Sequence, residues 1–331
     1  MSKLKVVIVG AGGWGGHHAR IFSSRQDVDL AGIFSRSPKK AAARAAEFRT
    51  RPYSDLPRML ATEQPDLVSV CLPNQAHFAT TLEIIRAGYP LFVEKPLVFD
   101  LNEAAILLDE ARQRNLFFAI NFNHRYARPI RMAREAIRSG RLGDIVFAWW
   151  RFGGEGGSTH PHGNLIETQC HAFDQLEDLC GPIDSIMSQM NGKPGGGFTT
   201  MALALQFVAG GIGSILGTYD SSYAYPGTHL LEINGTKGRL FIEDTVRRYS
   251  FQAVGNETAE VWQAGYFNDF DREFQRTFDA HIDAVLDAFR KGQPPPIPAE
   301  AGQRALQLAY AAIESFETGR RVKVAQVAQA V

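Results

Sequence analysis

The chain has 331 residues, and its 35 lysines and arginines balance its 35 aspartates and glutamates, so the formal net charge is zero with neutral histidines. This balance argues against a nucleic-acid partner, because proteins that follow phosphate backbones carry a surplus of cations. Hydrophobic residues make up 45% of the chain and charged residues 21%, a composition that excludes an intrinsically disordered protein. At about 150 residues per domain, the length predicts two domains with separate cores.

The chain has three cysteines, Cys71, Cys170 and Cys180. Their odd number and the absence of a CxxC pair argue against a disulfide framework and a structural zinc site. The sequence has no apolar run of about 18 residues that could span a membrane, and its first residues lack the apolar core and cleavage site of a signal peptide. We therefore expect a cytoplasmic protein with no membrane partner.

Residues 1–122 alternate between short apolar runs and longer segments with helical spacing. The pattern predicts strands at 5–9, 28–34, 67–70, 91–93 and 117–120, separated by helices at 13–24, 39–47, 77–87 and 102–114. Strands that are apolar along their whole length are covered on both faces, and the intervening helices supply the cover. We therefore expect an α/β Rossmann domain with a doubly wound parallel sheet.

Residues 123–331 have a different pattern. Helices are expected at 130–139, 165–179, 270–291 and 299–318, and a strand at 144–152 precedes a glycine-rich segment at 153–163. Residues 185–253 are typical of antiparallel strands, with turn signals at 195–197, 209–211 and 234–235. The second domain is therefore predicted to be α+β, with a large, mostly antiparallel sheet that has one open face. Because an open face needs cover, we expect a homodimer or homotetramer formed through this sheet.

A dinucleotide-binding motif follows the first predicted strand. Gly10, Gly12, Gly13, Trp14 and Gly15 belong to a GxGxxG pattern that opens a helix. Gly10 permits the tight turn, Gly12 lets the backbone approach a pyrophosphate, and Gly15 lets the helix pack close to its strand. The free N–H groups at the helix N-terminus would bind the anion. The motif therefore predicts NAD or NADP as cofactor.

The end of the second strand bears on the choice between these two cofactors. An acidic residue about 20 positions after the motif would bind the ribose 2′-hydroxyl of NAD. The sequence has Ser35, Arg36 and Ser37 there and no carboxylate, and these side chains suit a 2′-phosphate. The pattern favours NADP, although Arg36 stacked on the adenine of NAD would need the same residue.

Two further motifs lie at the carboxyl ends of predicted parallel strands, where ligands bind in open α/β sheets. They are the Pro-Asn-x-x-His turn at 73–77 and the Glu-Lys-Pro motif at 94–96. Together with the GxGxxG motif and an acid-x-x-x-His-x-x-Asp helix at 167–174, they make the chain resemble the Gfo/Idh/MocA family of oxidoreductases over its whole length. The resemblance implies cofactor contacts from Gly10, Gly12, Gly13, Trp14, Gly15, Ser35, Arg36, Pro73, Asn74, His77, Glu94 and Lys95.

Lys95 is the first candidate catalytic residue. It directly follows a buried strand, and the resemblance places it beside the substrate and the cationic nicotinamide, where the ammonium form is disfavoured. Pro96 stiffens the turn that holds Lys95, and the resemblance implies a cis Lys95–Pro96 bond. The alternative is a surface lysine paired with Glu94.

His171 is the second candidate catalytic residue. Helical spacing predicts that Glu167 and Asp174 share its face, so that two carboxylates orient an imidazole suited to proton transfer at neutral pH. A surface histidine on a capped helix is the alternative. The same residue types could ligate a metal, but the resemblance implies a metal-free reaction, and we expect no metal.

Two segments are expected to line a substrate cavity. The first, at 121–126, contains Arg125, which could equally be a structural ion-pair partner. The second begins at Trp149 and Trp150 and continues into the glycine-rich segment at 153–163. Adjacent strand residues point to opposite faces, so only one tryptophan can line the cavity. The predicted substrate-binding residues are Arg125, Tyr126, Trp150, His160, Glu167 and Asp174.

The predicted function is NAD(P)-dependent hydride transfer between nicotinamide and a secondary alcohol or hemiacetal carbon of a sugar, inositol or related polyol. His171 would take up the hydroxyl proton while Lys95 stabilises the developing alkoxide. One alternative is an NAD-dependent glycosidase that oxidises its substrate transiently, as some relatives do. The other is a non-catalytic NAD(P)-binding regulator, which would not need both Lys95 and His171.

Overall fold

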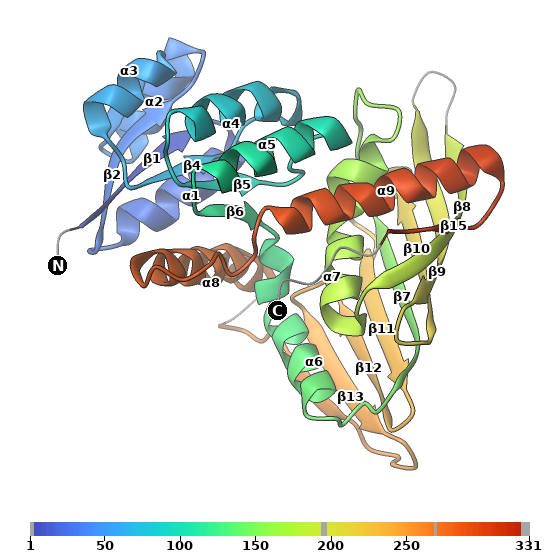
Figure 1. The fold of residues 1–331 in the computed structure, drawn as a ribbon. Coiled ribbons are helices and arrows are strands. Elements are labelled where there is room, and N and C mark those ends of the chain that lie inside the picture. The colour runs from blue at the N-terminus through green and yellow to red at the C-terminus, as the bar shows by residue number, and fades with distance from the viewer. Residues whose placement is uncertain (1–2, 193–196, 268–269, 326–331) are drawn as a thin grey trace. The chain divides into compact units, whose positions relative to one another are not determined.

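A computed structural model describes residues 3–192, 197–267 and 270–325 (Figure 1). The chain divides into two compact units. The first unit runs to Phe122 and also includes Phe278–Gln303, and the second comprises Asn123–Thr277 and the chain from Arg304 onward. No helix among the described residues is both long and apolar enough to cross a membrane.

The first unit contains a six-stranded parallel sheet, which confirms the predicted Rossmann domain. The strands have the order β3-β2-β1-β4-β5-β6. Their bounds are β1 (Leu4–Val9), β2 (Val28–Phe34), β3 (Arg51–Tyr53), β4 (Leu67–Val70), β5 (Leu91–Glu94) and β6 (Phe118–Asn121). The short strand β3 was not predicted, because its Arg51-Pro52-Tyr53 sequence lacks the apolar run of its neighbours.

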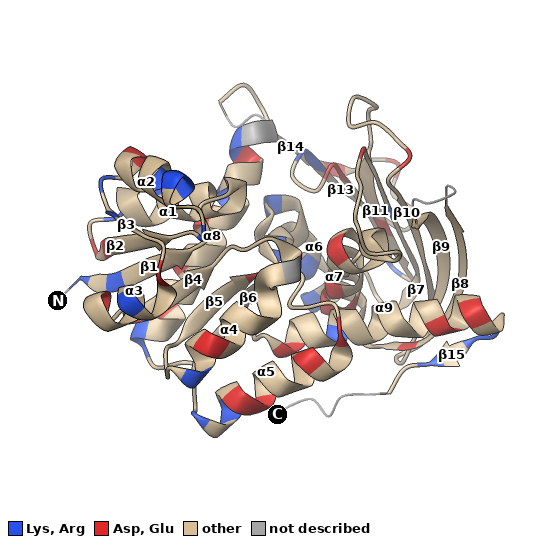
Figure 2. Ribbon diagram, turned by 90° about the horizontal axis from the view of Figure 1, so that it is seen from above, with Lys and Arg blue, Asp and Glu red and all other residues tan. Residues whose placement is uncertain are grey.

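Helices cover both faces of this sheet, as expected for strands that are buried along their length. Figure 2 shows α1, α2 and α8 on one face and α3, α4 and α5 on the other. The helices are α1 (Gly13–Ser24), α2 (Pro38–Glu47), α3 (Leu56–Glu63), α4 (His77–Arg86) and α5 (Leu101–Gln113), with a 3₁₀ turn η1 (Asn74–Ala76) before α4. Basic and acidic residues are interspersed on these helices (Figure 2), and some form surface ion pairs such as Arg86–Glu110.

The C-terminal part of α8 (Phe270–Arg290) and the residues after it as far as Gln303 belong to the first unit, although the sequence pattern assigned them to the second domain. His281 donates from Nδ1 to Asn121 Oδ1 (2.8 Å), and Phe278 stacks on Trp14. After the helix, the Ala299 N–H donates to the carbonyl of Phe118 (3.0 Å). This segment therefore covers one face of the parallel sheet and hydrogen-bonds the otherwise open edge of β6.

The second unit contains a nine-stranded sheet with the order β14-β13-β12-β11-β7-β10-β9-β8-β15. All neighbouring strands are antiparallel except β7 and β10, so the predicted mostly antiparallel sheet is confirmed. The strands are β7 (Ile145–Gly153), β8 (Ile183–Gly192), β9 (Phe198–Phe207), β10 (Ile212–Thr218), β11 (His229–Gly235), β12 (Gly238–Glu243), β13 (Arg248–Ala253), β14 (Glu260–Gln263) and β15 (Val322–Lys323).

The described helices of the second unit lie on one face of this sheet (Figures 1 and 2). They are α6 (Arg128–Arg138), α7 (Cys170–Cys180) and α9 (Glu300–Thr318), with short turns η2 (Asn123–Tyr126) and η3 (Asn164–Thr168). Along β9 and β10, residues alternate between buried and exposed. The exposed positions include Ile212 and Leu216, which are 63% and 47% exposed. The sheet thus has one packed face and one open face, as predicted.

Two local predictions in this unit were wrong. Asn234 and Gly235 lie inside β11, and the turn follows at Thr236-Lys237. The helix expected at 165–179 is divided, because η3 is a π-helical turn in which the Gln169 N–H donates to the carbonyl of Asn164. Residues 193–196, which include part of the predicted 195–197 turn, lie outside the described residues.

Candidate functional site

The GxGxxG motif forms a tight turn between β1 and the N-terminus of α1. Gly10 has a φ of +128°, and a Cβ on it would lie 2.1 Å from the carbonyl oxygen of Cys71. A Cβ on Gly15 would lie 2.0 Å from the carbonyl oxygen of Gly10. Both positions therefore require glycine, Gly10 for its backbone conformation and Gly15 for the close approach of helix to strand.

Gly12 and Gly13 have a different environment. A Cβ on either residue would meet no atom within 4 Å, so the backbone of the turn is open to an approaching group. Gly12 caps α1 without a side-chain hydrogen bond, and the first turn of α1 has no acidic residue. The N–H groups of this helix end are therefore available to an anion. These features fit the pyrophosphate of a dinucleotide.

Arg44 on α2 adds a cation beside this turn. Its guanidinium donates from Nη2 to the carbonyl oxygen of Gly12 (3.3 Å) and from Nη1 to Glu47 (2.7 Å). Sequence reasoning missed Arg44, because a basic residue within a helix of mixed charge carries no distinctive signal.

The predicted 2′-phosphate residues lie where β2 ends. Ser37 is the N-cap of α2 and accepts a hydrogen bond from the Lys40 N–H. The Ser35 hydroxyl accepts one from the Ser37 N–H (3.3 Å), and Arg36 is exposed. Ser37 therefore has a structural role in the turn, while Ser35 and Arg36 lie at the carboxyl edge of the sheet.

The turn after β4 carries Pro73, Asn74 and His77. Pro73 is exposed and Asn74 half-buried, whereas His77 is buried and donates from Nε2 to the carbonyl of Leu72 (2.9 Å). Burial lowers the pKa of the His77 imidazole. His77 therefore holds the turn in place from inside the unit, while Pro73 and Asn74 lie at its surface.

Glu94, at the end of β5, is part of a buried hydrogen-bonded cluster. Its Oε1 accepts from His18 Nε2 (2.9 Å) and from Asn121 Nδ2 (2.7 Å), and His18 Nδ1 lies 2.7 Å from the Ser69 hydroxyl. Burial opposes a charged His18, but Cys71 and the Glu94 carboxylate raise the pKa of His18 to about 10. Despite its burial, Glu94 has a lowered pKa because of His18 and Asn121. The structure therefore provides a buried ion pair directly before Lys95.

Lys95 is half-buried at the carboxyl end of β5. The Lys95–Pro96 peptide bond is cis, as predicted. Lys95 thus lies on the same sheet edge as the GxGxxG turn, at the position where doubly wound sheets bind ligands. Lys95 belongs to the first unit and His171 to the second.

His171, near the start of α7, is 6% exposed and stacks on His124 of η2. The ring centroids are 3.9 Å apart and the planes differ by 8°. Sequence reasoning included His124 only within the segment 121–126, which was expected to line a substrate cavity, and gave it no individual role. The contact joins two segments almost fifty residues apart, so no local pattern could have indicated it.

The two carboxylates predicted to flank His171 have partners of their own. Asp174 accepts from Arg125 through both oxygens, at 2.6 and 2.9 Å. Burial raises the pKa of Asp174 to about 6, while Arg125 acts in the opposite direction. Glu167, in η3, accepts from the Ser158 hydroxyl (2.6 Å). Because Glu167 lies in the π-helical turn and His171 in α7, the regular helical spacing on which the prediction relied is interrupted between them. Arg125 and Asp174 thus form the structural ion pair that the sequence left open.

Trp150 occupies the core and not a cavity wall. It is 1% exposed, donates from Nε1 to Gln169 Oε1 (3.3 Å), and lies edge-on to His229. Trp149 points to the opposite face of β7 and donates to Glu232 (2.8 Å). Tyr126 is half-buried beside Arg125, and burial raises its pKa. Trp150 is therefore part of the core of the second unit.

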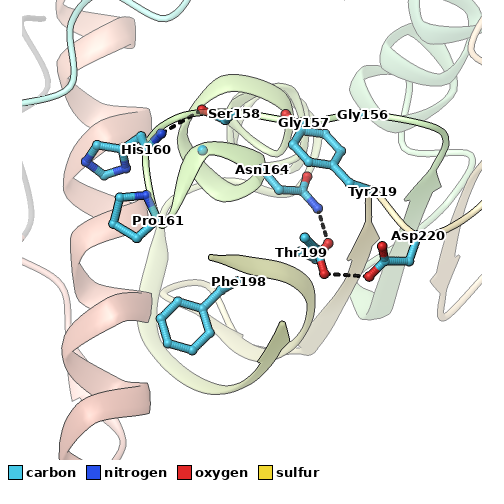
Figure 3. A pocket seen from close by; sticks show the side chains of 11 residues that line it. Gly156, Gly157, Ser158, His160, Pro161, Asn164, Phe198, Thr199, Tyr219 and Asp220 are labelled. Atoms are coloured by element: carbon cyan, nitrogen blue, oxygen red, sulfur yellow. Dashed lines mark hydrogen bonds between the residues drawn. The ribbon is translucent and has the colours of Figure 1, made fainter. Parts of the chain in front are cut away.

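The glycine-rich segment 153–163 lines a pocket of about 240 Å³ in the second unit (Figure 3). Ser158, His160 and Asn164 face Phe198, Thr199, Tyr219 and Asp220 across it. Asn164 donates to the carbonyl of Thr199 (2.7 Å), and the His160 N–H donates to the Ser158 hydroxyl (3.1 Å). The pocket wall thus offers hydroxyl, amide and imidazole groups beside the aromatic rings of Phe198 and Tyr219. Ser158, which lines the pocket, donates to Glu167, and this hydrogen bond connects the pocket wall to the turn that precedes His171.

Two glycines in this segment make room for tyrosine rings. A Cβ on Gly156 would lie 2.4 Å from the ring of Tyr219, and one on Gly154 would lie 2.3 Å from the ring of Tyr223. The Tyr219 hydroxyl is within 2.7 Å of the Thr168 hydroxyl. The segment therefore contains glycine because aromatic side chains pack directly on its backbone. Tyr219 was another residue that sequence reasoning missed.

Among the described residues, no three His, Cys, Asp or Glu side chains are grouped closely enough to hold a metal ion. The ionisable groups around His171 instead form pairs with arginine, serine or another imidazole. This donor arrangement does not form a metal centre in the described part of the chain.

Comparisons with known proteins cover both units. Residues 4–122 match a model described as an oxidoreductase family with an NAD-binding Rossmann fold, and residues 134–324 match the C-terminal alpha/beta domain of the same family. The myo-inositol 2-dehydrogenase of Thermotoga maritima is 23% identical over 98% of this chain and 99% of its own. The D-glucoside 3-dehydrogenase of Escherichia coli is 34% identical over 44% of this chain and 42% of its own.

A solved structure of a levoglucosan dehydrogenase in complex with NADH has the same fold. Its TM-score is 0.88 at 17% identity, over 98% of this chain and 100% of that chain. At this identity the likeness concerns the fold, and it extends over both units.

Proposed function

Since the chain belongs to this family, Gfo/Idh/MocA, and is an NAD(P)-binding oxidoreductase, we propose that it oxidises a secondary ring hydroxyl of a sugar or cyclitol, reversibly and with NAD(P). The observation that carries the proposal is the pair of candidate proton-handling groups, Lys95 at the carboxyl edge of the Rossmann sheet and His171 buried at the start of α7. Relatives named for inositol, glucoside and levoglucosan oxidation support the substrate class.

In this proposal the residues described above have separate roles. The open backbone at Gly12 and Gly13 and the N-terminus of α1 hold the pyrophosphate. When bound, the nicotinamide supplies the hydride acceptor. His171 accepts the proton of the reacting hydroxyl, and the Lys95 ammonium stabilises the negative charge that develops on its oxygen. In the reverse direction His171 returns the proton to the alkoxide oxygen.

The pocket beside the 153–163 segment is proposed to bind the part of the substrate that does not react. Its hydroxyl, amide and imidazole groups can bind ring hydroxyls, and Phe198 offers an apolar face. His160 suits this role as a neutral hydrogen-bonding group, because burial lowers its pKa.

The substrate screen that tests the proposal follows absorbance at 340 nm. Cyclitols, free sugars and glycosides are offered with NAD and with NADP, and reduced cofactor should appear with at least one ring polyol. Glycoside cleavage without net formation of reduced cofactor would instead identify a transiently oxidising glycosidase. Binding of NAD(P)H without turnover of any compound would favour a regulator and contradict the proposal.

We further propose NADP as the preferred cofactor. Ser35 and Arg36 occupy the edge of the sheet where an acidic residue would select NAD, and an exposed guanidinium suits a 2′-phosphate. Fluorescence titration with NADPH and NADH tests this preference. Arg36→Ala should weaken NADPH binding and leave NADH binding nearly unchanged, and tighter binding of NADH by the unaltered enzyme would overturn it.

The open face of the nine-stranded sheet is proposed to be the interface of a homodimer or homotetramer. Ile212 and Leu216 expose apolar side chains on its central strand β10, and burial against a second copy would remove them from water. We also place the enzyme in the cytoplasm, in keeping with three buried cysteines that are free thiols.

A further inference from the structure

The guanidinium of Arg44 on α2 lies against the first turn of α1. It donates from Nη2 to the carbonyl oxygen of Gly12 (3.3 Å) and from Nη1 to Glu47 (2.7 Å). Gly12 is the N-cap of α1, and its carbonyl also accepts from the Gly16 N–H (3.0 Å). The cation is therefore placed beside the helix end whose N–H groups are available to an anion.

Gly16 makes room for this guanidinium. A Cβ on Gly16 would lie 2.8 Å from Nη1, 2.9 Å from Cζ and 3.2 Å from Nη2 of Arg44. Gly16 follows the GxGxxG motif and is not part of it, and alanine is more stable than glycine inside a helix. The close approach of Arg44 therefore provides a physical reason for glycine at this position.

The charges around the guanidinium favour an anionic ligand. The first turns of α1 and α2 contain no acidic residue, and the cations Arg36, Lys39 and Lys40 lie at or before the start of α2. Glu47, which pairs with Arg44, has a side chain that is 53% exposed, against 25% for Arg44. Water and salt screen such an exposed carboxylate, so it neutralises the guanidinium only in part.

We propose that Arg44 is a further cofactor-binding residue, which contacts the pyrophosphate of the dinucleotide from the side of α2. A guanidinium has more N–H donors than its bonds to Gly12 and Glu47 use, and their fork matches phosphate oxygens. The motif glycines offer backbone N–H groups to the pyrophosphate, whereas Arg44 adds a full positive charge. The inference rests on the proposed placement of the pyrophosphate at Gly12 and Gly13.

Fluorescence titration with NADH tests this role without any substrate. NADH carries the pyrophosphate but no 2′-phosphate. Arg44→Gln keeps a donor for the Gly12 carbonyl but removes the charge, and it should bind NADH at least about tenfold more weakly, as the loss of a charge-assisted hydrogen bond predicts. Arg44→Lys retains the charge and should bind NADH more tightly than Arg44→Gln.

Three outcomes of these titrations would overturn the proposal. In the first, Arg44→Gln binds NADH as the unaltered enzyme does. In the second, the glutamine and lysine variants lose affinity equally, which indicates a structural role. In the third, only NADPH binding is weakened, which assigns Arg44 to the 2′-phosphate.

Lys40→Gln is the matched control. It removes an exposed cation from the same helix, and NADH affinity should remain that of the unaltered enzyme. A loss as large as that of Arg44→Gln would show that the overall charge of α2 is responsible, and it would contradict a specific contact of Arg44.

Gly16→Ala tests the same contact without removing a charge. The added methyl group would displace the guanidinium, which is the end of a flexible side chain, while alanine favours the helix. We therefore expect weaker NADH binding without a lower thermal stability. In Arg44→Gln, the further change Gly16→Ala should not weaken NADH binding again. Additive losses of NADH affinity would contradict the proposal.

The outcome for Arg44 is distinguishable from the outcome for the proposed reaction. Should no ring polyol be oxidised, the proposed reaction fails, while the NADH titrations still decide the role of Arg44. Loss of turnover in Arg44→Gln at saturating NAD and NADP is not expected, because the proposed contact lies at the pyrophosphate and not at the nicotinamide.

Discussion

At the scale of single residues, the predicted site residues fall into two groups. Some lie at the surface, where a ligand can reach them, and others are buried and hold the surrounding chain in place. Lys95 and Arg36 lie at the carboxyl edge of the Rossmann sheet, whereas His77 and Glu94 bind groups inside the unit. The Glu94 carboxylate is held by His18 and Asn121. Residues of the same sequence motif therefore have different roles, although they are neighbours in the sequence.

Lys95→Ala should bind NAD(P)H with nearly unchanged affinity and lose about 10²–10⁴-fold in turnover, the usual contribution of a positioned acid–base group. Fluorescence titration measures binding, and the 340 nm assay measures turnover. Arg36→Ala is the matched control, because it removes a cation from the same sheet edge and should affect cofactor affinity more than turnover. Near-normal turnover of Lys95→Ala would refute its catalytic role.

Gly12 and Gly15 should differ in what an added methyl group does. In Gly15→Ala the Cβ would lie 2.0 Å from a backbone oxygen, whereas in Gly12→Ala it meets no atom of the protein within 4 Å. We expect Gly15→Ala to destabilise the unit, and Gly12→Ala to fold normally but bind cofactor at least about tenfold more weakly, since lost hydrogen bonds to a charged group are worth about 1.5–3 kcal/mol. Thermal unfolding and cofactor titration distinguish the two, and normal cofactor binding by Gly12→Ala would show that the pyrophosphate does not approach there.

Residue-scale prediction from the sequence succeeded where chemistry forces a residue type. Gly10 and Gly15 are needed for backbone geometry, and the cis Lys95–Pro96 bond was expected from the motif. It failed for Trp150, whose burial depends on the contacts of β7 with α7. It also missed His124, because a stacking partner almost fifty residues away leaves no periodic signal.

At the scale of elements, the segments that shape the second unit are the π-helical turn η3 and the glycine-rich segment before it. The additional residue in η3 directs Gln169 into the core, where it bonds Trp150 and Asn164. Helical spacing in the sequence predicted one continuous helix, because the buried amide contacts that stabilise a π-helical turn are tertiary. Such turns are frequent at functional sites, and this one contains Glu167 and precedes α7, which carries His171.

Gly156→Ala and Gly157→Ala test the packing of the glycine-rich segment. A Cβ on Gly156 would lie 2.4 Å from the Tyr219 ring, whereas one on Gly157 would meet nothing within 4 Å. We expect Gly156→Ala to lower the free energy of unfolding by about 1–3 kcal/mol, as overpacking does, and Gly157→Ala to leave it unchanged. Urea unfolding measures both, and equal stabilities would show that Tyr219 does not pack on this segment.

The His18–Glu94 pair between α1 and β5 should make stability depend on pH. The pKa of His18 is raised to about 10 in the folded chain, against about 6.5 in the unfolded chain. Its stabilising contribution is therefore complete below about pH 6.5 and is lost as the pH rises toward 10. Urea midpoints should fall over this range in the unaltered enzyme and fall less steeply in His18→Gln.

His77→Gln is the control for this measurement. Burial lowers the pKa of His77, so this imidazole stays neutral above pH 6.5 and its replacement should not alter the slope. Identical slopes for His18→Gln and the unaltered enzyme would show that His18 is not charged in the folded chain.

At the scale of the whole molecule, the chain forms two units, and each unit is built from two separate segments of the sequence. The alternation of strands and helices predicted the Rossmann sheet, and the turn signals predicted the antiparallel sheet. The return of Phe278–Gln303 to the first unit was not predictable. An amphipathic helix pattern shows which face is apolar but not which sheet that face covers.

The open face of the nine-stranded sheet leads to a prediction about assembly. The unaltered enzyme should be a dimer or tetramer by light scattering, and Leu216→Glu on β10 should dissociate it, because a buried unpaired charge is costly. Ile106→Glu on α5, where the side chain is 42% exposed, should leave the assembly intact. A monomeric unaltered enzyme would end the proposal of this interface.

Deuterium transfer is the most direct measurement of the proposed hydride transfer from a ring carbon to the nicotinamide. The substrate is a ring polyol that the enzyme oxidises, with deuterium on the carbon that bears the reacting hydroxyl. The reduced cofactor is isolated, and its mass is measured by mass spectrometry. The reduced cofactor should be heavier by one deuterium, and Lys95→Ala should form almost none. Reduced cofactor without deuterium would contradict the claim.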